Sequence, residues 1–364
     1  MSSSRTIILG VESSCDETAC ALVADGQQVL ANVVASQVEL HERFGGVVPE
    51  VASRAHIEAI SSIIDEALAR GGVTPKEISA VAATCAPGLI GSLLVGLMAG
   101  KTLAWAWGKP LIGVNHVHAH AYSSALDAEP IEYPAVALVA SGGHTALYRC
   151  ESPTNLTLLG QTIDDAAGEA FDKVASILQL GYPGGPIVDR LAGKGNPAAV
   201  DLPRTLLKGQ SLDFSFSGLK TAVLYHVNGV PVGPEDQLGN QREQARRAQS
   251  STYGRRAENL SEQDKADIAA SFQAAVADVL GIKLRRAVTA VGARSILLGG
   301  GVAANSAIRA RSAEEAKKLH CALRLPPMKY CTDNAAMVAG LAYHQFLAGD
   351  LAGLDLEATA TMKR

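Results

Sequence analysis

Residues 6–34 read TIILGVESSCDETACALVADGQQVLANVV, in which apolar runs are separated by short polar segments. Apolar runs of this length, bounded by turn-forming residues, are typical of β-strands. The predicted elements are the strands Thr6–Glu12, Thr18–Ala24 and Gln28–Val34, the polar turn Ser13–Glu17 and the hairpin turn Asp25-Gly26. The segment therefore predicts a three-stranded meander at the start of the chain.

A similar pattern occurs again near residue 135. The predicted elements are the strand Ala135–Ala140, the turn Ser141-Gly142-Gly143, and the strands His144–Cys150 and Leu156–Leu159. Each meander has a polar turn after its first strand, which suggests an internal duplication. Two α/β lobes with a cleft between them would explain this repeat.

The remaining chain alternates helical and strand patterns. The predicted elements are a helix over 50–70, the strand Ile78–Cys85, a helix from Ser92, the strand Leu111–Val114, the helices Asp165–Leu180 and Glu262–Val291, the strand Ser295–Leu298, a helix from Asn305, a strand near Ala322–Leu325 and a last helix from Asp333. Strands that alternate with helices in this way predict an α/β fold.

The run from Ile78 to Gly100 contains no charged residue and is long enough to span a bilayer. Pro87-Gly88 interrupts it, which favours a buried strand, a turn and a buried helix over a membrane segment.

The apolar run Ile7–Val11 is too short for a signal peptide. The six cysteines form no C-x-x-C pair, and we expect a protein of the reducing cytoplasm.

The composition limits the function classes. Of the 364 residues, 48% are hydrophobic and 19% charged, which is enough to bury a sizeable core. Aromatic residues are only 4%, which argues against aromatic stacking platforms, and the net charge of −4 requires any nucleic-acid contact to use a local basic patch.

Residues 228–262 form a polar insertion with Arg242, Arg246, Arg247, Arg255 and Arg256. This insertion is either a solvated loop or a nucleic-acid contact.

The segment Asn115-His116-Val117-His118-Ala119-His120 holds three of the nine histidines. A strand would place all three on one face, whereas a helix places His116 and His120 together at i and i+4. The helix-compatible residues 119–126 favour the second arrangement, a two-histidine metal clamp. Buried histidines bonded to backbone are the alternative. Val117 stands where a zinc protease needs its glutamate, so that reading lacks its base.

A third metal ligand has to come from elsewhere, and Asp333 is a candidate, although a helix N-cap would also explain it. The glycine turns at 141–143, 184–186 and 299–301 are candidate phosphate contacts, because glycine lets backbone N–H groups approach an anion. The sequence contains no P-loop pattern. Ser13-Ser14, before Asp16-Glu17, is either a further phosphate or metal contact or a polar turn.

A series of short motifs occurs in order along the chain. They are GVESSCDET (10–18), GGVVPE (45–50), ASR (52–54), PGL and GSL (87–93), NHVHAH (115–120), SGGHT (141–145), DDAAGEAFDKVA (164–175), YPGGP (182–186), FSFSGLKT (214–221), GGVAAN (300–305) and TDN (332–334). In this order they closely resemble the TsaD family, once called O-sialoglycoprotein endopeptidase. The resemblance covers nearly the whole chain outside 228–262 and the C-terminal tail.

The resemblance implies an actin/Hsp70-like ATPase (ASKHA) fold, with two related lobes, a mixed sheet flanked by helices in each, and the active site in the cleft. We expect the lobes at 1–134 and 135–334, with a C-terminal helix at about 335–364 packed back on the first. The implied reaction transfers the threonylcarbamoyl group from threonylcarbamoyl-AMP to N6 of adenosine 37, next to the anticodon, in tRNAs that read codons beginning with A. The products are t6A and AMP.

The resemblance also implies roles for individual residues. His116, His120 and Asp333 match the family's ligands for one divalent metal, iron(II) or alternatively zinc, and a nucleotide (threonylcarbamoyl-AMP, ATP or AMP) occupies the cleft. The positions that match substrate contacts are Val139, Ala140, Ser141, Gly142, Gly143, Asp172, Gly185, Asp189 and Asn305. The family commonly reads Leu-Val-Ser-Gly-Gly where this chain has Val-Ala-Ser-Gly-Gly, a change that should spare backbone contacts. We expect Asp16 or Glu17 to assist proton removal from N6.

The implied partners are tRNA, a TsaB-like paralogue, a TsaE-like P-loop ATPase and a TsaC-like enzyme that supplies the adenylate, with no membrane. Three alternatives stay open at this point. They are a small-molecule kinase or ATPase of the same fold, a metalloendopeptidase, and a non-catalytic scaffold like the family's degenerate paralogue. That paralogue lacks the His-x-x-x-His pair, which this chain has.

Overall fold

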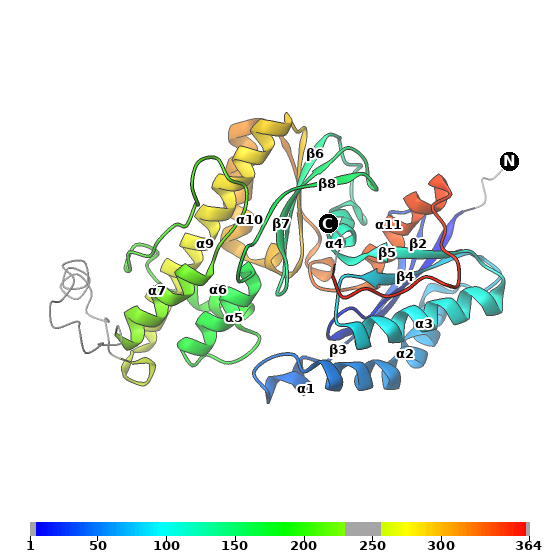
Figure 1. Cartoon of the computed structure of the whole chain (residues 1–364), viewed down its shortest axis with the longest axis horizontal. Coiled ribbons are helices and arrows are strands. Elements are labelled where there is room, and N and C mark those ends of the chain that lie inside the picture. Colours follow the sequence, from blue (N-terminus) through cyan, green and yellow to red (C-terminus); the bar gives the residue numbers. More distant parts are fainter. Residues whose placement is uncertain (1–4, 230–255, 362–364) are drawn as a thin grey trace.

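The computed structural model describes residues 5–229 and 256–361. Most of the polar insertion predicted at 228–262, including four of its five arginines, lies outside these residues. The described chain forms two five-stranded sheets side by side, each covered by helices (Figure 1). The predicted α/β class is confirmed.

The two sheets share one topology. The first contains β1 (Ile7–Glu12), β2 (Glu17–Ala24), β3 (Gln28–Ser36), β4 (Ile78–Ala86) and β5 (Leu111–Asn115), in the order β3-β2-β1-β4-β5. The second contains β6 (Ala135–Ala140), β7 (Thr145–Cys150), β8 (Leu156–Gln161), β9 (Ser295–Gly299) and β10 (Ala322–Arg324), in the order β10-β9-β6-β7-β8. In each, an antiparallel meander continues through its first strand into two parallel strands. The predicted duplication of the meander is confirmed.

Helices cover both faces of the first sheet. On one face lie α2 (Pro49–Gly71) and α3 (Ile90–Trp107), and on the other lies α11 (Ala335–Ala348). Successive strand residues serve opposite faces, so Ile8 packs with Met337 of α11 while Leu9 packs with Leu97 of α3. Gly10 allows α11 to come close, because an added Cβ would lie 2.6 Å from the Ala335 carbonyl oxygen.

The uncharged run from Ile78 to Gly100 is divided between β4, a turn and α3, as predicted. Among the described residues, α3 is the one helix whose length and composition would allow it to cross a membrane. Its residues Leu97 and Ala104 lie in the core of the first lobe.

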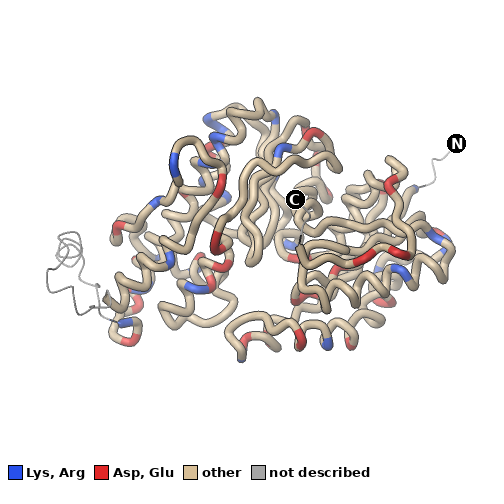
Figure 2. The backbone as a smooth tube through the Cα atoms, viewed as in Figure 1, with Lys and Arg blue, Asp and Glu red and all other residues tan. Residues whose placement is uncertain are grey.

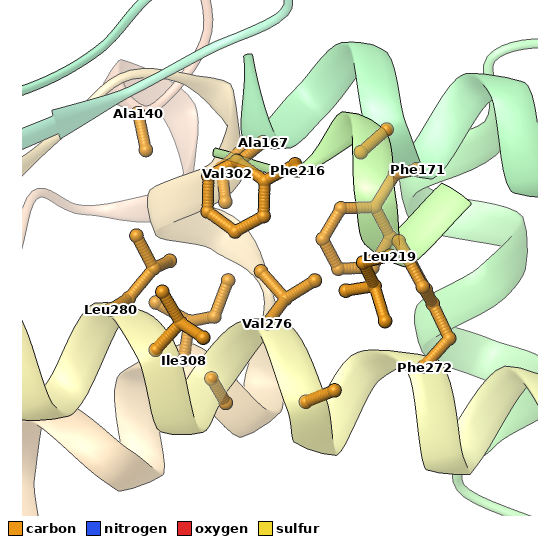
Figure 3. Packing of buried hydrophobic residues seen from close by; sticks show 14 of the residues in the cluster. Ala140, Ala167, Phe171, Phe216, Leu219, Phe272, Val276, Leu280, Val302 and Ile308 are labelled. Atoms are coloured by element: carbon orange, nitrogen blue, oxygen red, sulfur yellow. The ribbon is translucent and has the colours of Figure 1, made fainter. Parts of the chain in front are cut away.

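The second lobe has a larger helical layer. It consists of α5 (Ala167–Ile177), α6 (Gly184–Ala192), α7 (Ser217–Asn228), α9 (Glu262–Val291) and α10 (Ser306–Leu319). Figure 3 shows its core, where Phe171 and Phe272 meet edge to face beside Phe216, Leu219 and Val276. The short elements are α1 (Val38–Glu42), α4 (His116–Tyr122) and the 3-10 turns Ser123–Ala125, Ala257–Asn259, Gly301–Ala304 and Met328–Tyr330.

Three predictions about elements were wrong or incomplete. The last helix begins at Ala335, because the side chain of Asn334, and not that of Asp333, caps it by accepting from the Met337 N–H. It ends at Ala348, and the tail that follows pairs with the edge of the first sheet through Ala352 and Leu111. The helices α6 and α7 were not predicted at all.

Candidate active site between the lobes

A cleft of about 720 Å³ lies between the two sheets. The first lobe contributes the turn Ser14–Glu17, the loop Gly45–Val47, Pro87–Leu89 and His116. The second contributes Ser141–His144, Glu169, Asp172, Lys173 and Tyr182, with Asp333 from the connection to α11. The turns that follow β1 and β6 therefore both line the cleft.

Helix α4 carries two of the candidate metal ligands into this cleft. The Asn115 side chain caps it by accepting from the His118 N–H at 3.0 Å, which starts the helix directly after β5. One face of α4 packs on the first lobe through Ala119 and Tyr122, and another packs on the second through Val117 and Ala121. The predicted helix at the histidines is confirmed, and it spans His116–Tyr122.

The structure brings the three predicted ligands together. Asp333 Oδ1 lies 3.0 Å from His120 Nε2 and 3.6 Å from His116 Nε2, and one donor atom from each residue falls within 4.8 Å of the others. Both histidines are buried. His118 lies outside the cluster, where its ring meets the Tyr148 ring edge to face with 5.6 Å between the ring centroids. Two imidazoles and one carboxylate fit a divalent transition metal with coordination positions left for other ligands.

The charges of the cluster favour a bound cation. Burial lowers the pKa of His116, but the carboxylates of Asp333 and Glu12 outweigh it and raise this pKa to about 9. Burial raises the pKa of Asp333, but His116 and His120 lower it further, below its usual range. A proton on His116 thus offsets part of the negative charge of the buried Glu12 and the half-buried Asp333, and a metal would replace that proton.

Two residues at this site were missed by sequence reasoning. Glu12, at the end of β1, is fully buried and lies 3.0 Å from His116 Nδ1. A glutamate closing an otherwise apolar strand was the available signal. His144 lines the cleft, and burial, followed by the charges of His116 and His120, lowers its pKa to about 4. His144 follows Gly143 in the Ser-Gly-Gly-His-Thr motif, of which only the glycine turn was considered, as a phosphate contact.

The turn after β6 is built to present backbone. The Ser141 N–H donates to the His144 carbonyl at 2.7 Å, and the Ser141 carbonyl accepts from the Gly168 N–H at 3.1 Å. An added Cβ at Gly142 or Gly143 would meet nothing within 4 Å, so both glycines face open space. Val139 and Ala140, directly before this turn, are buried and are not part of the described cleft lining.

The other predicted substrate contacts fall into two groups. Asp172 lines the cleft and accepts from the Gly184 N–H at 2.7 Å, at the start of α6, where Gly185 follows. Asp189 and Asn305 are joined by Gln273, which donates to Asp189 at 3.0 Å and accepts from Asn305 at 2.8 Å. Gly185, Asp189 and Asn305 are not part of the described cleft lining.

Asp16 and Glu17 both line the cleft. Burial raises the pKa of the Glu17 carboxyl well above its usual range, and the charges of Asp333 and Asp16 act in the same direction. A raised pKa favours the protonated form of Glu17, which suits this carboxyl to donate a hydrogen bond.

Two mixed sheets of equal topology, with a cleft where their first turns meet, define an ATPase-type fold of the actin/Hsp70 class. Two HypF crystal structures resemble the chain at the level of fold. HypF of T. kodakarensis matches with a TM-score of 0.59 and 14% identity over 97% of this chain and 49% of that one. Full-length HypF in the phosphate- and nucleotide-bound form matches with a TM-score of 0.56 and 14% identity over 98% and 47%.

Sequence comparisons are more specific. The family model described as "TsaD: tRNA N6-adenosine threonylcarbamoyltransferase" matches residues 28–340. Relatives with that name include those of Symbiobacterium thermophilum, 50% identical over 98% of this chain and 96% of theirs, and Moorella thermoacetica, 49% identical over 97% and 96%. The relative in Anaeromyxobacter dehalogenans is 48% identical over 97% and 98%. The chain belongs to the TsaD family of tRNA N6-adenosine threonylcarbamoyltransferases.

Proposed function

We propose that this chain transfers the threonylcarbamoyl group from threonylcarbamoyl-AMP to N6 of adenosine 37 in tRNAs that read codons beginning with A. The products are t6A and AMP. The observation that carries the proposal is full-length similarity to transferases of this name, in a chain that retains His116, His120 and Asp333 within 4.8 Å at the cleft.

His116, His120 and Asp333 would hold one divalent ion, iron(II) or alternatively zinc. When bound there, it supplies Lewis acidity toward oxygen atoms of the substrate. Support comes from the donor set, from the neighbouring carboxylates, and from the placement of His116 and Asp333 in the wall of the cleft, with His120 buried directly behind them.

In the transfer, N6 of adenosine bonds to the carbonyl carbon of the mixed anhydride. The bond from that carbon to the phosphate oxygen breaks, and AMP leaves with the electron pair. We assign the backbone N–H groups of Gly142 and Gly143 to the phosphate, because both glycines face open space in the cleft, whereas the Ser141 N–H already donates to the His144 carbonyl. The other proposed substrate contacts are Asp172 on α5 and Gly185 at the start of α6, where Asp172 accepts from the Gly184 N–H. Asp189 and Asn305, which Gln273 joins, complete the set.

One N6 proton has to leave during the reaction. Since burial raises the pKa of Glu17, we assign the role of acceptor to Asp16, which is half-buried and lines the same cleft. Glu17 then donates a hydrogen bond within the turn or to the substrate.

The remaining proposals concern partners. We propose that tRNA binding uses local basic surface or partner subunits, because Lys and Arg are interspersed with Asp and Glu over both lobes (Figure 2). We also propose a TsaB-like and a TsaE-like partner, adenylate supply by a TsaC-like enzyme, and a cytoplasmic location. Deletion of the Arg-rich segment 230–255 should weaken tRNA binding; unchanged binding would favour partner subunits as the source of contact.

The test is incubation of the purified chain with threonylcarbamoyl-AMP, unmodified tRNA and candidate partners, followed by nucleoside mass spectrometry. We expect t6A to form and AMP to be released in equal amounts. ATP turnover in the absence of tRNA and partners, with no t6A in their presence, would instead indicate a kinase or ATPase of this fold.

A further inference from the structure

Glu12 is a buried carboxylate that the proposed reaction does not use. It ends the apolar strand β1, and its exposed fraction is 0%. Removing a carboxylate from water is costly unless hydrogen bonds or an opposite charge compensate for the lost hydration. The contacts of Glu12 therefore indicate what this strand end is built to hold.

Both carboxylate oxygens of Glu12 have partners. Oε2 accepts from the Thr84 hydroxyl at 2.7 Å and lies 3.0 Å from His116 Nδ1. Oε1 accepts from the Ser14 N–H at 2.5 Å, and the Ser14 hydroxyl lies 3.1 Å from the same His116 nitrogen. Strand β4 and the turn after β1 thus hold the carboxylate from two sides.

This geometry determines which nitrogen of His116 carries the proton. An ionised carboxylate only accepts hydrogen bonds, so His116 Nδ1 has to be the donor. The lone pair of neutral His116 is then at Nε2, the nitrogen 3.6 Å from Asp333 Oδ1. A histidine that binds a metal through one nitrogen typically donates its other N–H to such a group, which fixes the ring and strengthens the ligand.

The second histidine of the pair lacks this support. Within the described chain, His120 Nδ1 is buried and has no hydrogen-bond partner. The position of His120 comes instead from Asp333 and from close packing of α4 on β9, where a Cβ at Gly299 would lie 2.1 Å from the His120 carbonyl oxygen. The two candidate ligands are therefore held by different means.

We infer that Glu12 is a positioning residue for the metal site, which holds the His116 ring in the tautomer and orientation that present Nε2 to a divalent cation. This inference rests on the metal site of the proposed function. It assigns to β1 a role in metal affinity that is separate from the roles of Asp16 and Glu17 in the turn that follows.

The test is a Zn²⁺ titration of the metal-free full chain in competition with a chelating indicator. Glu12→Gln keeps the shape of the side chain but weakens the acceptor, and we expect the Zn²⁺ affinity to fall roughly 10- to 100-fold. Ser13→Ala is the matched control. Ser13 is the next residue and is equally buried, but its hydroxyl donates to the Ser92 carbonyl and accepts from the Gly96 N–H, on the α3 side of the strand. It should change the melting temperature and leave the affinity unchanged.

Wild-type Zn²⁺ affinity in folded Glu12→Gln would overturn the inference, as would an equal loss in Ser13→Ala. If Glu12→Gln does not fold, Glu12→Asp is used instead, because this variant keeps the charge but shortens the side chain by one methylene. Wild-type Zn²⁺ affinity in Glu12→Asp would also overturn the inference. The variant His116→Ala distinguishes failure of the metal site from failure of the role proposed for Glu12. Unchanged Zn²⁺ affinity in His116→Ala would contradict the metal site itself, whereas loss only in His116→Ala would contradict the role of Glu12 alone.

Discussion

The turns after β1 and β6 occupy equivalent places in two sheets of the same topology, yet their chemistry is opposite. The turn after β1 reads Ser-Ser-Cys-Asp-Glu and follows the buried Glu12, whereas the turn after β6 reads Ser-Gly-Gly-His. Both line the cleft. The turn of the first lobe thus places carboxylates beside the metal-ligand cluster, whereas the turn of the second lobe exposes glycine backbone to the cleft.

Packing around the two turns differs in the same way. A Cβ at Gly88 would lie 2.6 Å from the Ser14 carbonyl oxygen, so the first turn is packed tightly against the start of α3. Gly142 and Gly143 face open space, and only the base of their turn is packed, against Gly168. A duplicated scaffold therefore holds charged groups rigidly on one side and leaves N–H donors accessible on the other, which suits a metal site facing an anion site.

The largest effect should come from the metal side of the cleft. His116→Ala or His120→Ala should reduce t6A formation to below about 1% of wild type and abolish tight metal binding, because each removes a proposed ligand. His118→Ala is the matched control, since His118 lies on the same helix and faces Tyr148. Nucleoside mass spectrometry and a metal titration give the two readouts. Equal losses in all three variants would indicate damage to α4 rather than to a metal site.

A smaller effect should come from the backbone side. Gly168→Ala places a Cβ 2.5 Å from the Ser141 carbonyl oxygen, so the turn has to move. We expect a stability loss of about 1–3 kcal/mol and a higher KM for threonylcarbamoyl-AMP. Gly142→Ala, which meets no atom within 4 Å, should leave the melting temperature unchanged and alter KM alone. If both variants kept the melting temperature and the KM of wild type, the position of the turn would not matter for substrate binding.

The smallest effect concerns the protonation of Glu17. Burial raises the pKa of Glu17, and a group whose pKa is raised in the folded state contributes stability at low pH that is lost as pH rises through that value. Glu17→Gln mimics the neutral form, so in metal-free protein its melting temperature should rise relative to wild type as pH increases from about 5 to about 9. The exposed Glu129→Gln should show no such trend. A constant difference across this range would mean that Glu17 is not held protonated.

Much of this arrangement was predictable from the sequence, because it depends on local patterns. Apolar runs bounded by turn-forming residues located both meanders, and the spacing of His116 and His120 predicted one helix face. Helix α7 was missed because its N-terminus has no local cap. Asp164, far back in the chain, accepts from the Phe216 and Ser217 N–H groups instead. A cap supplied from another segment leaves no signal at the helix start.

The charged cluster shows the same limit. The sequence offered Asp333 only as one candidate for the third ligand and the family resemblance then matched it; the local alternative, a helix cap, belongs to its neighbour Asn334. The partners of Glu12 are Thr84 and His116, on two other elements, so its burial becomes evident only when β1, β4 and α4 are assembled. Roles that depend on tertiary contact cannot be read from spacing.

Metal removal and restoration tests the central claim most directly. The full chain is stripped with a chelator, dialysed, and assayed with threonylcarbamoyl-AMP, unmodified tRNA and the partners required, before and after addition of iron(II) or zinc. We predict that t6A formation is lost on stripping and restored by one of these ions in wild type, and that His116→Ala is not restored. Full t6A formation by the stripped wild-type chain would contradict the account.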